Sequence, residues 1–262
     1  MMRFCPLYSG SSGNVSFVEG GGTRLLIDAG LPGKTVTSAL EARDIDPRSI
    51  GGILITHDHS DHVAGVGVFA RKYKTPVYAN AATMRAMAGV TGQIPPALMR
   101  VFETGRDFFI NSLNIYPFPI PHDAAEPVGY CLTDGASKLT VMTDIGAFND
   151  NLFAAAAGSA LIMIESNHDV EMLKCGSYPY PLKRRILGPE GHLSNDGCAE
   201  ALIRLYSTGV RRAVLAHLSL DNNYEALALE TVREALRAAD IRDGDFRIAL
   251  AHRNIVGDMY EL

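Results

Sequence analysis

Cysteine is scarce in this sequence and lacks the spacings that make it a structural element. The four cysteines are Cys5, Cys131, Cys175 and Cys198, and no two of them form a C-x-x-C pair. A disulfide framework or a thiolate zinc site requires closer or patterned spacing. We therefore expect reduced thiols, as in a cytoplasmic protein.

Long hydrophobic runs are also absent. The longest, residues 152–164, has 13 residues and contains a Gly-Ser break, whereas a membrane span needs about 20. The N-terminal residues reach a Ser/Gly cluster almost at once and contain no apolar signal-peptide core. These absences predict neither a membrane span nor export, and they favour a cytoplasmic location.

An excess of positive charge is the third absence. The chain has 24 Lys and Arg against 29 Asp and Glu, a formal net charge of −5, which argues against a broad basic face for nucleic acid. A local basic groove stays possible, and the candidates are Lys183-Arg184-Arg185, Arg211-Arg212 and Arg253. We interpret them by default as solvated helix and turn faces.

The chain has 262 residues, enough for one large domain or two small ones. Short apolar stretches bounded by turn residues predict strands in the first half. These are residues 15–18, 24–28, 52–56 and 76–79. Segments with helical spacing lie between them. These are residues 35–43, 63–73 and 82–88.

The second half begins with three closely spaced strands and then alternates between strand and helix. The three strands are residues 113–120, 128–133 and 138–143. The alternation consists of strand 160–165, helix 196–206, strand 213–215, helix 225–239 and strand 246–249. One doubly wound sheet would not contain the three-strand meander, so the order predicts an α+β fold, a four-layer α/β/β/α sandwich. No linker divides the chain, and we expect a single domain over residues 1–262.

One short segment concentrates metal-binding side chains. After the apolar residues 53–55 the chain reads Thr56-His57-Asp58-His59-Ser60-Asp61-His62, an H-x-H-x-D-H pattern. In extended chain His57 and His59 project the same way, while Asp61 and His62 enter the next helix and turn toward a second point. Such nitrogen and oxygen ligands suit zinc, manganese or iron(II). A polar loop with incidental histidines is the alternative, but three of only eight histidines lie in these six positions.

Three further candidates come directly after apolar strands. They are His122, Asp144 and His217. Taken alone, each is equally a capped core histidine or a turn aspartate. Together with the first segment they predict ligands that a sandwich gathers from distant parts of the chain at one rim.

These motifs resemble those of the metallo-β-lactamase fold hydrolases. The resemblance runs from about Ser9 to Asn223, and within the superfamily the chain looks most like the WalJ/YycJ-type proteins, which are similar to tRNase Z and the β-CASP nucleases. The residues that carry it are 26–30, 56–62, His122, Thr143-Asp144, 191–195 and 215–219.

The resemblance implies a centre of two divalent metal ions, zinc or manganese with iron as a further candidate. It implies a ligand set for each ion and one bridging carboxylate. The first ion is expected on His57, His59 and His122, the second on Asp61, His62 and His217, and the bridge is Asp144. Asp28 is expected to orient a ligand histidine, or else to be a plain turn residue at the end of a strand.

Two other residues are expected to assist catalysis. In tRNase Z-like enzymes a glutamate and a histidine help to cleave the phosphodiester, and Glu165 and His192 occupy similar elements here. His192 precedes a predicted helix capped by Ser194 or Asn195 and is otherwise a capping-turn residue. Asp61 or Asp144 is a candidate acceptor for the proton of the attacking water.

Two features near these candidates keep a simpler interpretation open. His168 is taken as a residue of the first turn of a helix rather than as a substrate contact. The Gly/Ser-rich loop 9–14 is as consistent with a hairpin turn as with a phosphate-cradling loop. It has no P-loop ending, so the sequence does not indicate binding of a nucleoside triphosphate.

The leading functional prediction is a metal-dependent phosphodiesterase, specifically a 5′→3′ exonuclease-like nuclease acting on DNA or RNA. The chain has no obvious room for a β-CASP insertion or an exosite arm, which disfavours RNA-processing roles. One alternative is a hydrolase of a small ester, thioester, lactone or cyclic phosphodiester on the same metal site. Another is a non-hydrolytic metal-binding regulatory protein, which the complete H-x-H-x-D-H pattern disfavours.

Overall fold

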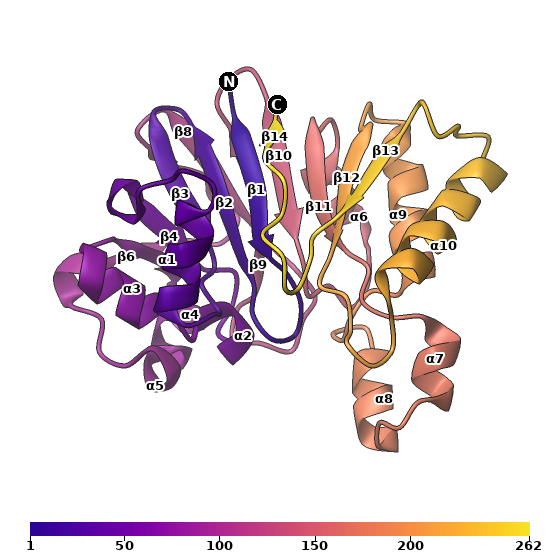
Figure 1. Ribbon diagram of the computed structural model, residues 1–262, viewed down its shortest axis with the longest axis horizontal. Coiled ribbons are helices and arrows are strands. Elements are labelled where there is room, and N and C mark those ends of the chain that lie inside the picture. The colour runs from indigo at the N-terminus through magenta and orange to yellow at the C-terminus, as the bar shows by residue number, and fades with distance from the viewer.

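The computed structural model describes all residues, 1–262, and contains two seven-stranded sheets packed face to face with helices outside (Figure 1). In spatial order the first sheet consists of β14 (Tyr260–Glu261), β1 (Arg3–Tyr8), β2 (Val15–Gly20), β3 (Thr23–Ile27), β4 (Gly52–Leu54), β5 (Val77–Asn80) and β6 (Met99–Phe102). The second consists of β13 (Arg247–Leu250), β12 (Arg212–Ala216), β11 (Leu161–Glu165), β10 (Lys138–Met142), β9 (Val128–Thr133), β8 (Leu113–Pro119) and β7 (Phe108–Ile110). The predicted four-layer sandwich is confirmed.

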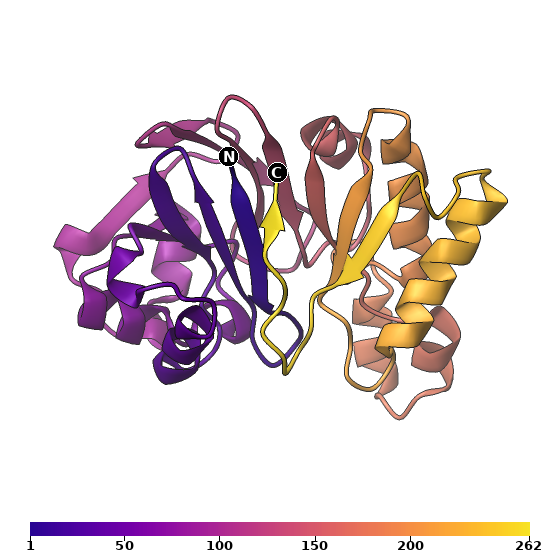
Figure 2. The ribbon, with the colours of Figure 1, turned by 45° about the horizontal axis from the view of Figure 1, so that its top comes forward.

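Helices form the two outer layers. Those in the first half of the chain are α1 (Gly33–Glu41), α2 (Ser60–Val63), α3 (Val66–Tyr73), α4 (Ala81–Ala86) and α5 (Ala88–Thr91), with short 3₁₀ turns at Pro47–Ser49 and Pro96–Leu98. Those in the second half are α6 (Asp150–Ala156), α7 (Val170–Cys175), α8 (Tyr180–Ile186), α9 (Asn195–Tyr206) and α10 (Glu225–Ala238). Figure 2 shows that the first group lies beside the first sheet and the second group beside the other. No helix has both the length and the apolarity that a membrane crossing requires.

Each sheet is antiparallel on one side and parallel on the other. Strands β3 to β6 are parallel in the first sheet, and strands β10 to β13 are parallel in the second. Apart from the edge strands β6 and β13, the parallel strands are almost entirely buried and therefore read as largely apolar runs. In β3, Leu25 and Ile27 pack between the two sheets, while Leu26 packs under the helices. In both sheets, candidate site residues follow the carboxyl ends of parallel strands.

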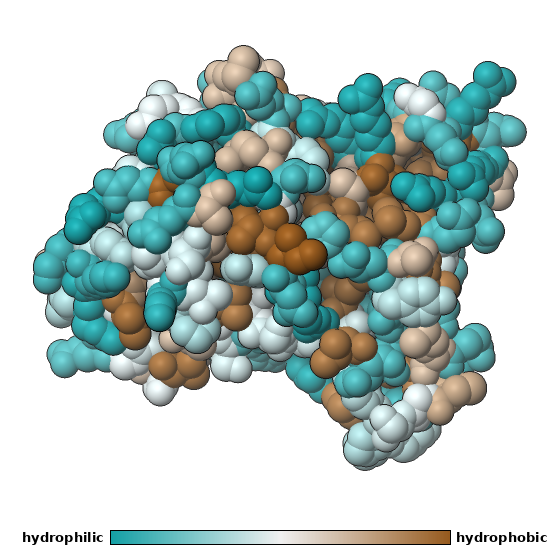
Figure 3. All heavy atoms as spheres, viewed as in Figure 1, coloured by the Kyte–Doolittle hydropathy of each residue, from teal (hydrophilic) through white to brown (hydrophobic).

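The surface and the cysteines agree with the composition of the chain. Figure 3 shows hydrophilic residues over most of one face, with hydrophobic residues gathered near its middle, where the two sheets meet. All four cysteines are free, and three of them, Cys5, Cys131 and Cys198, are buried. The expectation of unpaired thiols is thus confirmed for this structure.

Two predicted helices are confirmed with shifted ends. The predicted helix 63–73 corresponds to α3, which begins only at Val66 because residue 63 ends the separate helix α2, and the predicted helix 82–88 corresponds to α4, which ends at Ala86 before α5 begins. Between α2 and α3, the backbone at Gly65 packs so closely on the loop after β3 that a Cβ there would lie 1.9 Å from the carbonyl oxygen of Leu31. This tertiary contact fixes the break. The strands β1, β6, β7 and β14 and the helices α6, α7 and α8 were not predicted individually.

Gly30 makes the same kind of contact nearer to the predicted metal ligands. Its backbone N–H donates to the carbonyl of Asn14, and a Cβ on it would lie 1.6 Å from the carbonyl oxygen of Asp61. The N–H of neighbouring Ala29 donates to the carbonyl of His62 at 2.9 Å. The loop after β3 therefore holds the first turn of α2 in place by direct backbone contact.

We predict that Gly30→Ala lowers the free energy of unfolding by about 3 kcal/mol, the upper end for inserting a methyl group into a packed site. The control is Gly89→Ala in α5, where an added Cβ would have no atom within 4 Å, and where alanine should be neutral or stabilise by up to about 1 kcal/mol. Urea unfolding of both variants measures the difference. Equal free energies of unfolding for the two variants would contradict the prediction, because they would show that the loop after β3 moves to accommodate the methyl group without destabilising the fold.

Candidate metal centre

The predicted site residues converge at the carboxyl ends of strands from both sheets. His57 and His59 follow β4, and Asp61 and His62 lie in α2. The others come from elsewhere in the chain: Asp28 after β3, His122 after β8, Asp144 after β10, Glu165 at the end of β11, His192 before α9 and His217 after β12. Ligand-capable atoms from these positions form four groups, and within each group the atoms all lie within 4.8 Å of one another.

Three of these residues have a left-handed backbone. Asp28, Asp144 and His217 have φ angles of 59°, 59° and 56°, and each follows a parallel strand within two residues. This conformation costs a non-glycine residue roughly 1–2 kcal/mol. Strain of this kind is retained where the surrounding structure enforces it and clusters at functional sites. Its repetition at three strand ends supports a common functional site.

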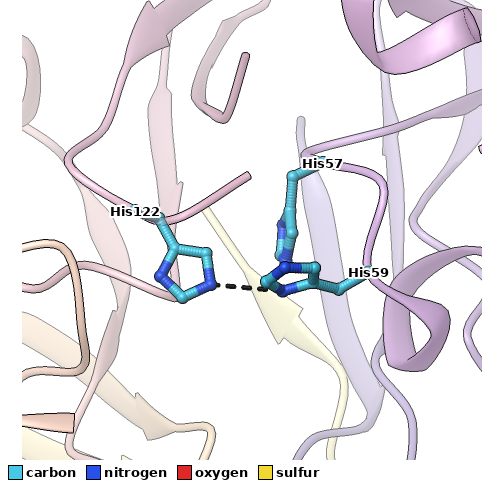
Figure 4. A group of neighbouring side chains, drawn as sticks. All are labelled: His57, His59 and His122. Carbon is cyan, nitrogen blue, oxygen red and sulfur yellow. Dashed lines mark hydrogen bonds between the residues drawn. The ribbon is translucent and has the colours of Figure 1, made fainter. Parts of the chain in front are cut away.

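The first group consists of His57, His59 and His122 (Figure 4). The Nε2 atom of His122 lies 3.3 Å from Nδ1 of His59, and the ring of His57 is 4.7 Å from that of His59 and 5.1 Å from that of His122. The Nδ1 atom of His122 is held by the carbonyl of Gly191 at 3.0 Å. Three imidazoles with nitrogens turned toward one point match the first predicted ligand set.

The second group consists of Asp61, His62 and His217. The Oδ2 atom of Asp61 lies 3.5 Å from Nε2 of His62 and 3.4 Å from Nε2 of His217. Asp144 lies between the two groups: its carboxylate is 3.2 Å from Nε2 of His62 and 3.8 Å from Nε2 of His122. The structure thus brings together the residues of the second predicted ligand set and places Asp144 between the two groups; that Asp144 bridges two ions stays a prediction.

The residues fit a pair of divalent cations. Nε2 of His57 is buried without any hydrogen-bond partner, and Oδ2 of Asp144 makes no well-aligned hydrogen bond although Nε2 of His62 lies 3.2 Å away; an unsatisfied buried polar atom is costly in a folded protein. Both atoms are good ligands for zinc, manganese or iron. Bound cations would satisfy both atoms and neutralise the buried carboxylates.

Asp28 fixes one of the candidate ligands. Its Oδ2 accepts a hydrogen bond from Nδ1 of His62 at 2.7 Å, and Thr56 donates to the same carboxylate from its N–H at 2.9 Å and its hydroxyl at 2.7 Å. The other ring nitrogen, Nε2 of His62, is thereby aimed at Asp61 and Asp144. Such a carboxylate–imidazole pair orients a metal-binding histidine and raises its basicity.

Glu165 makes the corresponding contacts from the second sheet. Its Oε1 accepts from Nδ1 of His217 at 2.9 Å and from Nδ1 of His192 at 2.8 Å. Its Oε2 accepts backbone N–H groups from Ile145 at 2.8 Å and from Leu193 at 3.1 Å. The Glu165 side chain is fully buried, so it contacts two imidazoles and no solvent.

Buried charges set the protonation of the site in the absence of metal. Burial opposes the charged form of Glu165, but the imidazoles of His192 and His217 outweigh it and hold the pKa of Glu165 at about 2. Burial also disfavours a charged His217, yet Asp144, Asp61 and Glu165 raise its pKa to about 10. Burial and the neighbouring His62 lower the pKa of His57 well below its usual value. The carboxylates are thus anions that require positive partners.

Among the candidates outside the two ligand groups, His192 is the most exposed to solvent. Its side chain is 14% exposed, and its ring centre lies 5.1 Å from that of His122 and 5.4 Å from that of His217. Its Nδ1 is occupied by Glu165, while its Nε2 makes no hydrogen bond within the protein. The predicted cap of the following helix is confirmed, because the Ser194 side chain accepts from the N–H of Gly197.

His168 is buried next to this site and lies just before α7. It is 1% exposed. Its backbone forms an isolated parallel β-bridge with that of Ser194. Burial lowers its pKa to about 4. The prediction that His168 lies in the first turn of a helix is wrong, because Asp169 caps α7 and His168 precedes it; both of its ring nitrogens are buried without a hydrogen-bond partner.

Asn14 belongs to the site, although no motif in the sequence marks it. Its side-chain amide lies 3.0 Å from Nε2 of His62 and 3.3 Å from Oδ2 of Asp61. It ends loop 9–14, which joins the antiparallel strands β1 and β2. The loop is therefore a hairpin turn that also touches the candidate ligands, and only its Gly/Ser composition could have drawn attention to it.

The predicted basic clusters are mostly engaged within the protein. Arg185 pairs with Asp123, and Lys183 donates to the carbonyls of Lys174 and Gly176 at the end of α7. Arg211 and Arg212 likewise donate to backbone carbonyls, those of Tyr206 and Val210 and that of Glu261. Arg253 alone lies beside loop 9–14, where it donates to the hydroxyl of Ser11 at 3.2 Å.

The comparison with known families agrees with this geometry. A model of the beta-lactamase superfamily domain matches residues 23–218. The chain belongs to this superfamily. The matched range contains every predicted metal ligand, which confirms the resemblance seen in the motifs.

Relatives narrow the similarity within the superfamily. The exodeoxyribonuclease YycJ of Bacillus anthracis is 40% identical over 235 residues, 90% of this chain and 89% of that protein. The metallo-β-lactamase fold protein YhfI of Bacillus subtilis superposes with a TM-score of 0.73 at 14% identity over all of both chains. The short form of human tRNase Z superposes with a TM-score of 0.62 at 16% identity, covering 83% of this chain and 93% of that one. The structures confirm the fold, and YycJ confirms the predicted resemblance to YycJ-type proteins.

We predict that Asp28→Asn weakens metal binding by about 10- to 100-fold, the usual cost of removing a partner behind a ligand histidine. Asparagine tolerates the left-handed backbone at this position, so the fold should persist. Metal retention against a competing chelator, followed by elemental analysis, measures the effect.

The matched control is Asp44→Asn. Asp44 is exposed and has a φ of 56°, so the substitution and the backbone conformation are the same as at position 28. Its metal affinity should equal that of the wild type. Equal affinities for the two variants would contradict the role assigned to Asp28.

Proposed function

We propose that this protein is a metal-dependent exonuclease that hydrolyses phosphodiester bonds of DNA with a 5′→3′ direction. The observation that carries the proposal is the pair of adjoining ligand groups, with Asp144 between them. Two adjacent cations suit phosphodiester hydrolysis because they can stabilise both the attacking and the leaving oxygen. The 40% identity to an exodeoxyribonuclease over 90% of the chain supports DNA as the substrate.

The chain's residues would hold two divalent cations, zinc or manganese with iron as a further candidate. His57, His59 and His122 would bind one, Asp61, His62 and His217 the other, and Asp144 both. When bound, the cations would supply an activated water and neutralise charge on the phosphoryl group. Asp28 and Glu165 hold His62 and His217 in the orientation that binding requires.

His192 is proposed to act on the substrate directly. Because Glu165 fixes its Nδ1, the free Nε2 is available to donate a proton to the departing oxygen. Glu165 is fully buried and acts through His192 and His217, so it is a positioning residue. Asp61, whose side chain is 22% exposed, is the carboxylate best placed to accept a proton from the attacking water.

An exonuclease assay tests the proposed function. The purified protein, stripped with a chelator and reloaded separately with zinc, manganese or iron, is given 5′-labelled and 3′-labelled DNA and RNA oligonucleotides. We expect degradation of DNA that requires added metal and releases nucleotides progressively from the 5′ end. Hydrolysis of a thioester or lactone instead of DNA, or no degradation with any metal, would contradict the proposal.

We predict that His192→Ala lowers turnover of a dinucleoside monophosphate, whose departing alkoxide needs a proton, by about 10²- to 10⁴-fold, the usual contribution of general acid–base catalysis. Metal content should not change, because the predicted ligand sets do not include His192. The control is His252→Ala, which removes a partly exposed histidine paired with Glu225 and should leave this small-substrate turnover unchanged. Full activity of His192→Ala, or loss of its metal, would argue against the assigned role.

A further inference from the structure

A cavity of about 290 Å³ adjoins the candidate metal centre. Its lining includes Ser9, Leu218, Tyr224 and Arg253, from loop 9–14, the segment after β12 and the C-terminal segment. Figures 1 and 2 both show the C-terminal segment passing beside the loop between β1 and β2. None of the groups proposed above to bind metal or donate a proton lines this cavity.

Backbone contacts connect the cavity directly to the metal centre. The N–H of His217 donates to the hydroxyl of Ser9 at 2.9 Å, and Leu218 follows His217 in the chain. The other end of loop 9–14 is Asn14, which contacts His62 and Asp61. Since consecutive Cα atoms are about 3.8 Å apart, the cavity lies within a nucleotide's length of the ligand groups.

Arg253 supplies the cavity with a positive charge that no carboxylate pairs with directly. Its guanidinium donates to the carbonyl of Leu218 and, weakly, to the hydroxyls of Ser11 at 3.2 Å and Ser12 at 3.4 Å. Two carboxylates lie nearby without a direct salt bridge to it: Asp221 accepts from the hydroxyl of Tyr178 at 2.8 Å and attracts the guanidinium at longer range, and Glu225 lines the cavity and pairs with His252 at 2.7 Å.

The loop is shaped around this guanidinium. A Cβ at Gly10 would lie 2.9 Å from two guanidinium atoms of Arg253, and Gly10 has a φ of +150°. Glycine therefore allows the backbone to approach the charge closely. Burial lowers the pKa of Arg253, as expected for a cation that lacks a paired anion in the protein.

An exposed aromatic ring completes the cavity on the solvent side. Tyr224 is 57% exposed and Leu220 is 68% exposed, and both line the cavity. Aromatic rings of this kind stack on nucleobases and contribute about 1–3 kcal/mol per base in single-strand binding proteins. A guanidinium and a ring that line the same cavity match the phosphate and the base of one nucleotide.

We propose that this cavity binds a nucleotide of the substrate next to the bond that is cleaved, with its phosphate on Arg253 and its base on Tyr224. The inference rests on the proposed nuclease function and names part of its specificity. The phosphate is either a 5′-terminal monophosphate or an internal phosphodiester, two sources of the same chemistry that substrates can distinguish.

The central experiment compares Arg253→Gln with wild type on a single-stranded DNA oligonucleotide and on bis-p-nitrophenyl phosphate, which is too small to reach both sites. We expect KM for the oligonucleotide to rise about 10-fold or more, as for loss of a charge-assisted phosphate contact. Small-substrate turnover and metal content should stay within about two-fold of wild type, because Arg253 contacts no predicted ligand. The salt dependence of log KM should become shallower by about 0.7, the value for one phosphate contact on a single strand.

Two further comparisons sharpen the assignment. Tyr224→Leu should raise KM for the oligonucleotide while Tyr224→Phe, which keeps the ring, should not. Arg48→Gln is the matched charge control, because Arg48 is 81% exposed and lies in the 3₁₀ turn before β4, at the end of the sheet opposite the metal centre. It should leave KM unchanged.

Substrates with a 5′-phosphate or a 5′-hydroxyl identify the source of the phosphate. An Arg253→Gln effect confined to 5′-phosphorylated DNA assigns the cavity to the terminal phosphate, and an equal effect on both assigns it to an internal one. Wild-type cleavage with no change in KM for Arg253→Gln would overturn the cavity assignment alone. Absence of wild-type cleavage would overturn the nuclease proposal and, with it, the cavity assignment that rests on it.

Discussion

The structure depends on pairing buried carboxylates with imidazoles. Asp28, Asp144 and Glu165 are each at most 3% exposed, and a buried carboxylate costs several kcal/mol unless it is paired and hydrogen-bonded. Each has an imidazole within 3.2 Å. Because Asp144 follows a strand of the second sheet and His62 follows a strand of the first, the Asp144–His62 pair joins the rims of the two sheets. Pairing the buried charges of the site therefore also constrains how the two sheets pack together.

The two sheets contribute equivalent parts to this arrangement. Asp28, at the end of β3 in the first sheet, holds Nδ1 of His62, and Glu165, at the end of β11 in the second, holds Nδ1 of His217. In both cases Nε2 then faces Asp61. Glu165 also holds His192, so one carboxylate couples a candidate ligand to the proposed proton donor. A change at Glu165 would consequently disturb metal binding and proton transfer together, whereas His192 can be altered alone.

The sequence predicted what is encoded locally. The H-x-H-x-D-H spacing and the apolar runs before His122, Asp144 and His217 depend on strand periodicity, and the structure brings all of these residues together. What escaped prediction depends on contacts between distant segments. The break at Gly65 is set by the carbonyl of Leu31, strand β14 exists only because it pairs with β1, and the approach of Asn14 to His62 follows from the β1–β2 hairpin. No local pattern encodes these contacts.

The charge distribution favours an enzyme that acts at a chain end. The net charge is −5, and of the predicted basic clusters Lys183, Arg185 and Arg212 are engaged by internal partners, while Arg184 is exposed. Nucleic-acid backbone is held through Lys and Arg contacts with phosphates, so these clusters favour a few contacts over a long basic groove. An endonuclease must hold strand on both sides of the cleaved bond, whereas an exonuclease needs only the terminal nucleotides. The engagement of most of the predicted basic clusters and the position of Arg253 therefore favour the same mode of action.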